Sequence, residues 1–272
     1  MPEKPLAKSR RRTNAAEPRG DPQFAQTLER GLRVLQCFTA DSPSLGNGDL
    51  AARTGLPKAT VSRLTHTLIE LGYLRRREDG ARFEVGTGVL CLGYPVLARL
   101  AFRRVALPHL SQLAKAINGI AAISVRDRLR MVTLENSIQR DVLRRGAATG
   151  FTLDFIGSTV GRGWLAGATT SERDRLWREI TRSAPDQLDR VREDYRDLLK
   201  QLARDGFTWL KGAVRPDTAA LATPLRRRPG DELLVLSCAV DLPPSRGAIV
   251  LRQAGEHMLG AAQAIASELV SA

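Results

Sequence analysis

The chain has 272 residues, 43% of them hydrophobic, which is enough to bury a substantial core and to form two domains of ordinary size. No apolar run reaches the roughly 18 residues that a membrane-spanning helix requires, and the N-terminal residues lack the hydrophobic segment of a signal peptide. We therefore expect a cytoplasmic protein without a membrane partner. The formal net charge of +13 favours a polyanionic partner, although charge alone does not decide the function.

Residues 1–22 are polar, rich in proline, lysine and arginine, and without an apolar period, which predicts a disordered basic arm. Two interpretations remain open: the arm binds DNA phosphates, or it is a solvated tail. The cysteines lie far apart in apolar segments, and this spacing favours buried free thiols over a disulfide or a metal site; they are Cys37, Cys91 and Cys238.

A helical period begins at Phe24 and ends in the turn-forming stretch ADSPSLGNG. Its apolar residues recur on one side of the expected helix, at Leu28, Leu32, Val34 and Leu35. A short second helix, DLAART, follows, with Asn47 as its N-cap and Gly55 as its end.

The stretch GLPKATVSRLTHTL, residues 55–68, predicts a third helix. Pro57 suits its first turn, where a missing amide proton leaves no acceptor unpaired. Apolar residues at three- and four-residue spacing form one stripe, which we expect to pack on the two earlier helices: Val61, Leu64, Leu68 and Leu71. Two helices that cross closely at a tight turn are typical of a helix-turn-helix.

The other side of this third helix is expected to face outward. It carries short or cationic side chains that can approach a DNA groove and bind phosphates or base edges: Lys58, Ala59, Thr60, Ser62, Arg63 and His66. An ordinary solvated face is the alternative, but such a face usually mixes glutamate with lysine, and this one does not. The pattern therefore favours a recognition helix for double-stranded DNA.

The next segment, GYLRRREDGARFEV, alternates in polarity around Asp79-Gly80, a dipeptide typical of two-residue hairpin turns. Two short strands joined by a tight turn directly after a recognition helix form a wing. Its arginines are expected to lie along the DNA backbone or reach the minor groove: Arg75, Arg76, Arg77 and Arg82.

Three stretches together closely resemble the DNA-binding domain of IclR-family transcriptional regulators: ERGLRVLQCF, LAARTGLPKATVSRLTHTLIELGYLRR and GTGVLCLG. The resemblance covers residues 24 to about 100. It implies a winged helix-turn-helix domain over 23–87, a linker helix over 88–102 and an effector-binding domain over 103–272. It also implies a homodimer or a homotetramer.

The second half of the chain mixes helices with strands. Residues 88–118 have a helical pattern, with Pro95 and Pro108 as kinks or breaks. Strands are predicted at IAAISVRD and MVTLENS, which form a hairpin, and at GFTWL, TAALATPL and DELLVLSCAV. Helices are predicted at SERDRLWREI, PDQLDRVREDYRDLLKQLARDG and GAIVLRQAGEHMLGAAQAIASELV. This mixture predicts an α+β domain with a mixed or antiparallel sheet.

This half resembles the GAF-like effector-binding domain of the same family. The resemblance places ligand contacts at the start of a small-residue helix and on a strand: Ser158, Thr159, Val160, Ser237 and Ala239. Asp154, Trp164 and Ala239 stand where the family has proline, leucine and serine. A small aromatic or carboxylic effector is implied, and a diverged oligomerisation module without a ligand is the alternative.

An enzyme is the main alternative from another class. The stretch GSTVGRGWLAG lacks the Gly-Lys-Ser/Thr ending of a phosphate-binding loop. A nucleophile needs a base beside it, yet His66, His109 and His257 lie outside any catalytic motif. Metal ligands at short spacing are absent from the sequence. We therefore expect no catalytic residue, metal or cofactor, and an enzyme domain fused to a winged helix is the less favoured alternative.

Taken together, these patterns predict a sequence-specific DNA-binding regulator, either a repressor or an activator. Two winged domains related by a two-fold axis would insert their recognition helices into successive major grooves of a pseudo-palindromic operator. The resemblance to the family further implies that a small organic effector bound to the C-terminal domain changes the affinity for DNA.

Overall fold

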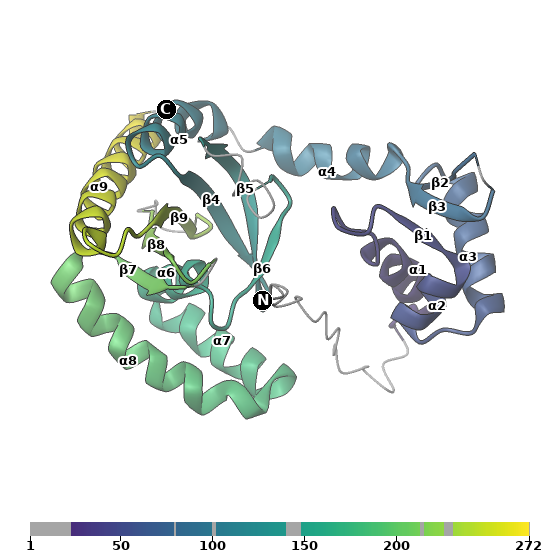
Figure 1. Cartoon of the computed structure of the whole chain (residues 1–272). Coiled ribbons are helices and arrows are strands. Elements are labelled where there is room, and N and C mark those ends of the chain that lie inside the picture. Colours follow the sequence, from purple (N-terminus) through teal and green to yellow (C-terminus); the bar gives the residue numbers. More distant parts are fainter. Residues whose placement is uncertain are drawn as a thin grey trace, which may run out of the picture. The chain divides into compact units, whose positions relative to one another are not determined.

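A computed structural model of the chain describes residues 23–78, 80–99, 102–139, 148–212, 215–225 and 231–271. The predicted arm over 1–22 and the turn residue Asp79 lie outside these ranges. The chain divides near residue 100 into two compact units, coloured purple to blue and teal to yellow in Figure 1.

The N-terminal unit combines helices with a small sheet (Figure 1). Its helices are α1 (Gln26–Gln36), α2 (Asn47–Thr54), α3 (Lys58–Glu70) and α4 (Gly88–Arg99). Its strands are β1 (Ser44–Gly46), β2 (Leu74–Arg76) and β3 (Arg82–Val85), paired antiparallel in the order β1-β3-β2. Two helices joined by a tight turn and followed by a hairpin form the predicted winged helix-turn-helix.

One apolar core joins the helices of this unit to its sheet. Its buried members include Val34 of α1, Leu50 of α2, Val61 and Leu68 of α3, and Phe83 of β3. The predicted inward stripe of α3 is therefore correct at these positions. Leu71, which was predicted to belong to this stripe, is 59% exposed, so its prediction is wrong. The apolar side of α1 is only partly buried, since Leu28 and Leu32 are 64% and 48% exposed. In α1 the buried side is that of Val34, and Leu71 lies just beyond the end of α3.

The ends of α2 and α3 are set by local backbone chemistry. Gly46, in an extended conformation, is the N-cap of α2, and its amide donates to Asp49 Oδ2 at 3.0 Å. The prediction that Asn47 caps the helix is therefore wrong by one residue. Gly55 ends α2 as predicted, with a φ of 71° that a side chain would strain. Pro57 directly precedes α3, which begins at Lys58.

The sheet departs from the sequence-based expectation at β1. This strand lies inside the stretch predicted to be a turn, because Leu45 pairs with Phe83 and buries its side chain in the core. In the hairpin, the Arg77 amide donates to the Arg82 carbonyl at 3.0 Å, so these two residues are paired. The predicted turn at Asp79-Gly80 includes Asp79, which lies outside the described residues.

The C-terminal unit is built on an antiparallel sheet in the order β6-β5-β4-β9-β8-β7. Its strands are β4 (Ile120–Asp127), β5 (Arg130–Ile138), β6 (Thr152–Asp154), β7 (Thr208–Lys211), β8 (Thr218–Pro224) and β9 (Leu234–Asp241). Its helices are α5 (Phe102–Ala116), α6 (Thr159–Gly167), α7 (Thr170–Ser183), α8 (Leu188–Asp205) and α9 (Gly247–Ser271), with a short 3₁₀ turn at Pro185–Gln187 before α8. The predicted α+β class is correct, and β6 is a strand that the sequence pattern missed.

Helices cover both faces of this sheet (Figure 1). Helices α5 and α9 pack on one face, which receives Leu236, Cys238 and Val240 of β9. Helices α6 and α7 pack on the other face, which receives Val235. Because side chains alternate along a strand, Ser237 and Ala239 share the face of Val235 and lie toward α6. The sheet thus brings two predicted ligand residues to the side of the predicted small-residue helix.

The prolines and cysteines singled out in the sequence lie in helices or in the core. Pro95 lies inside α4 and Pro108 inside α5, so neither proline breaks its helix. Cys37 and Cys238 are buried free thiols as predicted, whereas Cys91 is exposed on α4, and its prediction is wrong. Burial raises the pKa of the Cys238 thiol to about 12. Across the described ranges, no helix has the length and apolar character needed to cross a membrane.

Candidate nucleic-acid interface and ligand site

Helix α3 presents an uncompensated cationic surface. Lys58, Ser62, Arg63 and His66 are exposed, and Val61 lies buried on the opposite side. Ala59 is exposed as well, and Thr60 is half-buried. Within the described ranges, no hydrogen bond or ion pair engages the side chains of Lys58, Arg63 or His66. Their charges and donors are therefore free to meet phosphates or base edges without breaking an internal contact.

Three wing arginines already have partners within the hairpin. Arg75 lies 2.8 Å from Glu84, and Arg77 lies 3.6 Å from the other oxygen of the same carboxylate. Arg76 stacks over the Phe83 ring at 5.1 Å and donates to the Gly80 carbonyl. Glu84 thus neutralises part of the positive charge of the wing, although all three side chains remain exposed.

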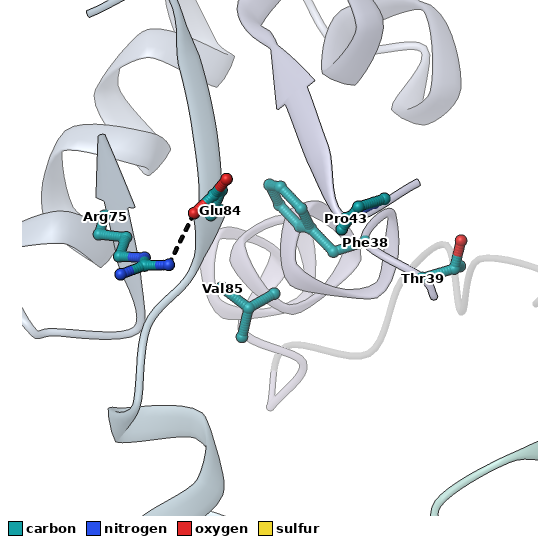
Figure 2. Close-up of a pocket in the computed structure, with 6 residues that line it drawn as sticks. All are labelled: Phe38, Thr39, Pro43, Arg75, Glu84 and Val85. Carbon is teal, nitrogen blue, oxygen red and sulfur yellow. Dashed lines mark hydrogen bonds and ion pairs between the residues drawn. The ribbon is translucent and has the colours of Figure 1, made fainter. Parts of the chain in front are cut away.

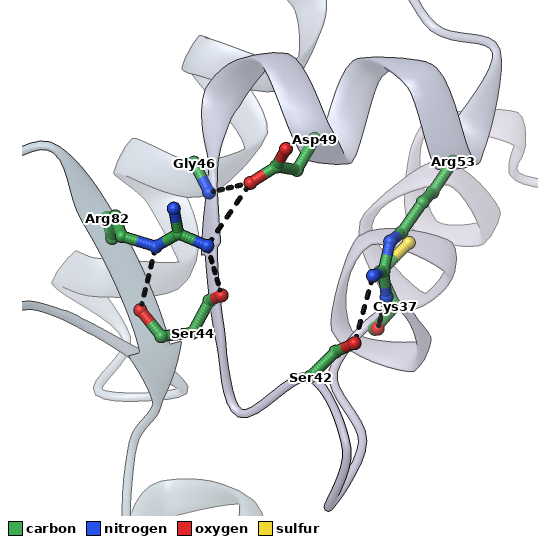
Figure 3. A network of polar contacts seen from close by, with 7 residues as sticks. All are labelled: Cys37, Ser42, Ser44, Gly46, Asp49, Arg53 and Arg82. Atoms are coloured by element: carbon green, nitrogen blue, oxygen red, sulfur yellow. Dashed lines mark hydrogen bonds and ion pairs between the residues drawn. The ribbon is translucent and has the colours of Figure 1, made fainter. Parts of the chain in front are cut away.

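The fourth wing arginine, Arg82, points into a network that Figure 3 shows. Its guanidinium donates to the Ser44 carbonyl at 2.8 Å and the Ser44 hydroxyl at 3.3 Å, and lies 3.4 Å from Asp49 Oδ2. Asp49 simultaneously accepts the amide that caps α2. Arg82 therefore connects the wing to β1 and to the start of α2.

A second arginine in Figure 3, Arg53, holds the segment that connects α1 to β1. Arg53 of α2 donates to the Cys37 carbonyl and to the Ser42 hydroxyl, each at 2.9 Å. Sequence reasoning missed Asp49 and Arg53. The Asp49 role could have been found, because an acidic residue three positions after an N-cap is a capping-box signal.

Beside this network lies an open hollow of about 370 Å³, shown in Figure 2. Phe38, Pro43 and Val85 provide its apolar part, and the Arg75–Glu84 ion pair its polar edge. Of the predicted DNA-contacting residues, only Arg75 lines it. Its lining contains no histidine or cysteine that could act as a nucleophile's base or as a nucleophile.

In the C-terminal unit, close packing brings α6 onto the sheet. A Cβ atom at Gly163 would lie 2.8 Å from both Ala222 and Val235, so only glycine allows this approach. Thr159 is one helical turn before Gly163 and is 2% exposed. Ser237 and Ala239, each 9% exposed, belong to the strand face that α6 covers. Helix start and strand therefore converge on the same side of the sheet.

Polar groups at this helix start differ in how well they are paired. The Ser158 hydroxyl caps α6 by accepting the Gly161 amide at 3.0 Å, and it donates to the Phe155 carbonyl. The Ser237 hydroxyl donates to the Ala122 carbonyl at 3.4 Å. The Thr159 hydroxyl is buried and has no hydrogen-bond partner among the described residues. The amides of Thr159 and Val160 lie in the first helical turn, where no intrahelical acceptor exists.

Comparison with known proteins assigns the chain to a family. A family model described as the IclR helix-turn-helix domain matches residues 27–78. The regulator TsaQ1/TsaQ2 of Comamonas testosteroni is 31% identical over 203 residues, which span 73% of this chain and 72% of that protein. The chain belongs to the IclR family of transcriptional regulators. The Pca regulon regulatory protein of Pseudomonas putida is 28% identical and matches 80% of this chain and 75% of its own length.

Solved structures of IclR-family proteins share the fold. An IclR-family regulator from Brucella abortus aligns with a TM-score of 0.73 at 34% identity, covering 94% of this chain and 97% of that protein. An IclR homologue from Microbacterium hydrocarbonoxydans, solved in complex with 4-hydroxybenzoate, aligns with a TM-score of 0.63 at 23% identity. It covers 88% of this chain and 99% of that protein. The helix-turn-helix plus effector-domain layout implied by the sequence is therefore correct.

Among the described residues of this IclR-family chain, no group of three metal-ligating side chains could hold an ion. The His109 ring nitrogen Nε2 lies 2.9 Å from the Glu268 carboxylate. The relatives named above bear the names of regulatory proteins.

Proposed function

We propose that this regulator binds a pseudo-palindromic operator with α3 in the major groove. The observation that carries the proposal is the unpaired cationic surface of α3. Arg63 and His66 read base edges, and Lys58, Thr60 and Ser62 bind phosphates or bases, with Ala59 allowing close approach. Arg75, Arg76 and Arg77 lie along the backbone, and the predicted arm over 1–22 adds further phosphate contacts.

The proposed DNA-binding form is a dimer. The N-terminal unit leaves large apolar side chains exposed just before α1, on α1 and on α4: Phe24, Leu28, Leu32, Leu90, Leu92, Tyr94 and Val96. Exposed apolar groups of this number support an association surface. A second copy covering them gives the two-fold symmetry that a palindromic site requires, and pairs of dimers give the tetramer.

The proposed domain boundaries follow the sequence: a DNA-binding domain over 23–87, a linker helix over 88–102 and an effector-binding domain over 103–272. In the last of these, a small organic acid binds between the start of α6 and β9, contacting Ser158, Thr159, Val160, Ser237 and Ala239. The free first-turn amides of α6 support an anionic group there. The protein acts on DNA in the cytoplasm and catalyses no reaction.

Selection of genomic fragments by the purified protein, at a stated salt concentration, identifies the operator. Arg63→Ala is then titrated on that site and on a scrambled duplex. We expect operator affinity to fall by about 1–3 kcal/mol with relaxed sequence preference. Arg192→Ala, an exposed arginine on α8, is the matched control and should leave both affinities unchanged. Fragments without a shared motif would contradict sequence-specific recognition.

A further inference from the structure

Two polar atoms on α6 are buried without a hydrogen-bond partner: the Thr159 hydroxyl oxygen and Arg162 Nε. The two residues are three positions apart, which places them about 60° from each other around the helix. Both therefore lie on one flank of α6 within its first turn. Neither residue has any other hydrogen bond or ion pair of its side chain in the described part of the chain.

Neighbouring polar side chains do have partners. Ser158 caps α6 with its hydroxyl, so the cap does not explain the free Thr159 hydroxyl. A second arginine over α6, Arg126, stacks on Trp164 at 4.5 Å and donates to Glu179 at 3.0 Å. Arg162, by contrast, has no carboxylate partner within the described ranges. A buried donor without an acceptor destabilises the fold unless a ligand supplies one.

We propose that Thr159 and Arg162 together bind the anionic group of the effector, a carboxylate. This inference rests on the proposed function, which places an effector at the start of α6. It adds the residues that select the charge of the effector. The Thr159 hydroxyl and Arg162 Nε–H donate to the carboxylate oxygens, beside the free amides of Thr159 and Val160. Arg162 lies outside the positions that the family resemblance indicated and determines specificity for anions over neutral isosteres.

The first test needs no ligand. Replacing a buried, unpartnered hydroxyl by a methyl group of similar shape removes a destabilising group, so ligand-free Thr159→Val is expected to melt at the wild-type temperature or about 2–4 °C higher. Arg162→Met is expected to behave in the same way. A melting temperature lowered by a similar amount in both variants would mean that these groups are satisfied within the protein, and would overturn the proposal.

The second test uses calorimetry of the full-length protein with acetate, benzoate and 4-hydroxybenzoate, and with 4-hydroxybenzamide as the neutral isostere. We expect at least one carboxylate to bind, the benzamide to bind at least tenfold more weakly, and Arg162→Gln to lose at least tenfold in carboxylate affinity. Arg175→Gln, an exposed arginine on α7, is the control and should bind as the wild type does.

The outcomes separate this inference from the function on which it rests. Binding of no carboxylate, equal binding of the benzamide, or carboxylate binding that ignores Arg162 would each refute the anion site. Operator binding by the wild-type protein is measured in parallel without any ligand. Failure of that measurement would refute the proposed DNA-binding function, whatever the calorimetry shows.

Discussion

Replacing Arg82 with alanine removes the contacts that hold the wing to β1 and to the start of α2. The Arg82 and Asp49 side chains are 46% and 48% exposed, so their ion pair contributes only about 0.2–1 kcal/mol. The hydrogen bond to the Ser44 carbonyl adds about 1 kcal/mol. Loss of both should loosen the wing by about 1–2 kcal/mol, which corresponds to a roughly 5- to 30-fold weaker operator complex.

The salt dependence of binding distinguishes this role from direct phosphate contact. Each phosphate contact contributes about 0.9 to the slope of log K against log salt. Since the Arg82 guanidinium is held by Ser44 and Asp49, we expect Arg82→Ala to weaken binding while leaving the slope unchanged. Arg76→Ala, on the same hairpin, should lower the slope by about one unit. The assay is a fluorescence titration on the selected operator at four salt concentrations.

A second variant completes the Arg82 experiment. Asp49→Asn keeps an oxygen that accepts the Gly46 amide but removes the charge that faces Arg82. The double variant should therefore lose less affinity than the sum of the single losses, because both changes disrupt one network. A slope reduced by about 0.9 in Arg82→Ala, together with additive losses, would show that Arg82 contacts phosphate, and our reasoning would be wrong.

Three further predictions concern assembly, packing and thiol chemistry. Leu28→Glu should shift the sedimentation coefficient toward that of the monomer, whereas Leu199→Glu, a change at an exposed residue of α8, should not. A dimer that is unchanged by Leu28→Glu would exclude the α1 surface from the dimer interface. Gly163→Ala should lower the free energy of unfolding, measured in urea, by about 1–3 kcal/mol. Gly260→Ala, whose added Cβ meets nothing within 4 Å, is the control and should not lower it. Equal free energies of unfolding for the two variants would refute the tight packing of α6. Because burial raises the pKa of Cys238 to about 12, this thiol should resist iodoacetamide at pH 8 until the protein unfolds, and native alkylation seen by mass spectrometry would contradict its burial.

The parts of the fold that the sequence predicted well are those specified by local periodicity. Val61 and Leu68 face the core because helical spacing puts them on one side of α3. Strands β4 and β5 follow from runs of β-branched residues around a short turn. Strand β1 had no such signal, because three residues, Ser44–Gly46, become a strand only by pairing with β3.

The same limit explains why the apolar residues of α1 differ in burial. Leu28 and Val34 both fit an apolar helical period, but periodicity does not tell which part of a wide apolar face meets the core and which remains for a partner. The candidate ligand site shows a related limit. Thr159 was predicted from family resemblance, whereas Arg162 could be found only from the burial of its Nε in the folded chain.

Arg63 and Arg82 show most directly what sequence alone leaves open about the DNA interface. Both are exposed arginines in the winged helix-turn-helix, and both were predicted to contact DNA for the same reason, their charge. Among the residues that the structure describes, Arg63 has no side-chain partner, whereas Arg82 is engaged by Ser44 and Asp49. Glu84 further neutralises the wing through Arg75. The uncompensated charge is therefore concentrated on α3, and α3, more than the wing, should set both the affinity and the specificity of operator binding.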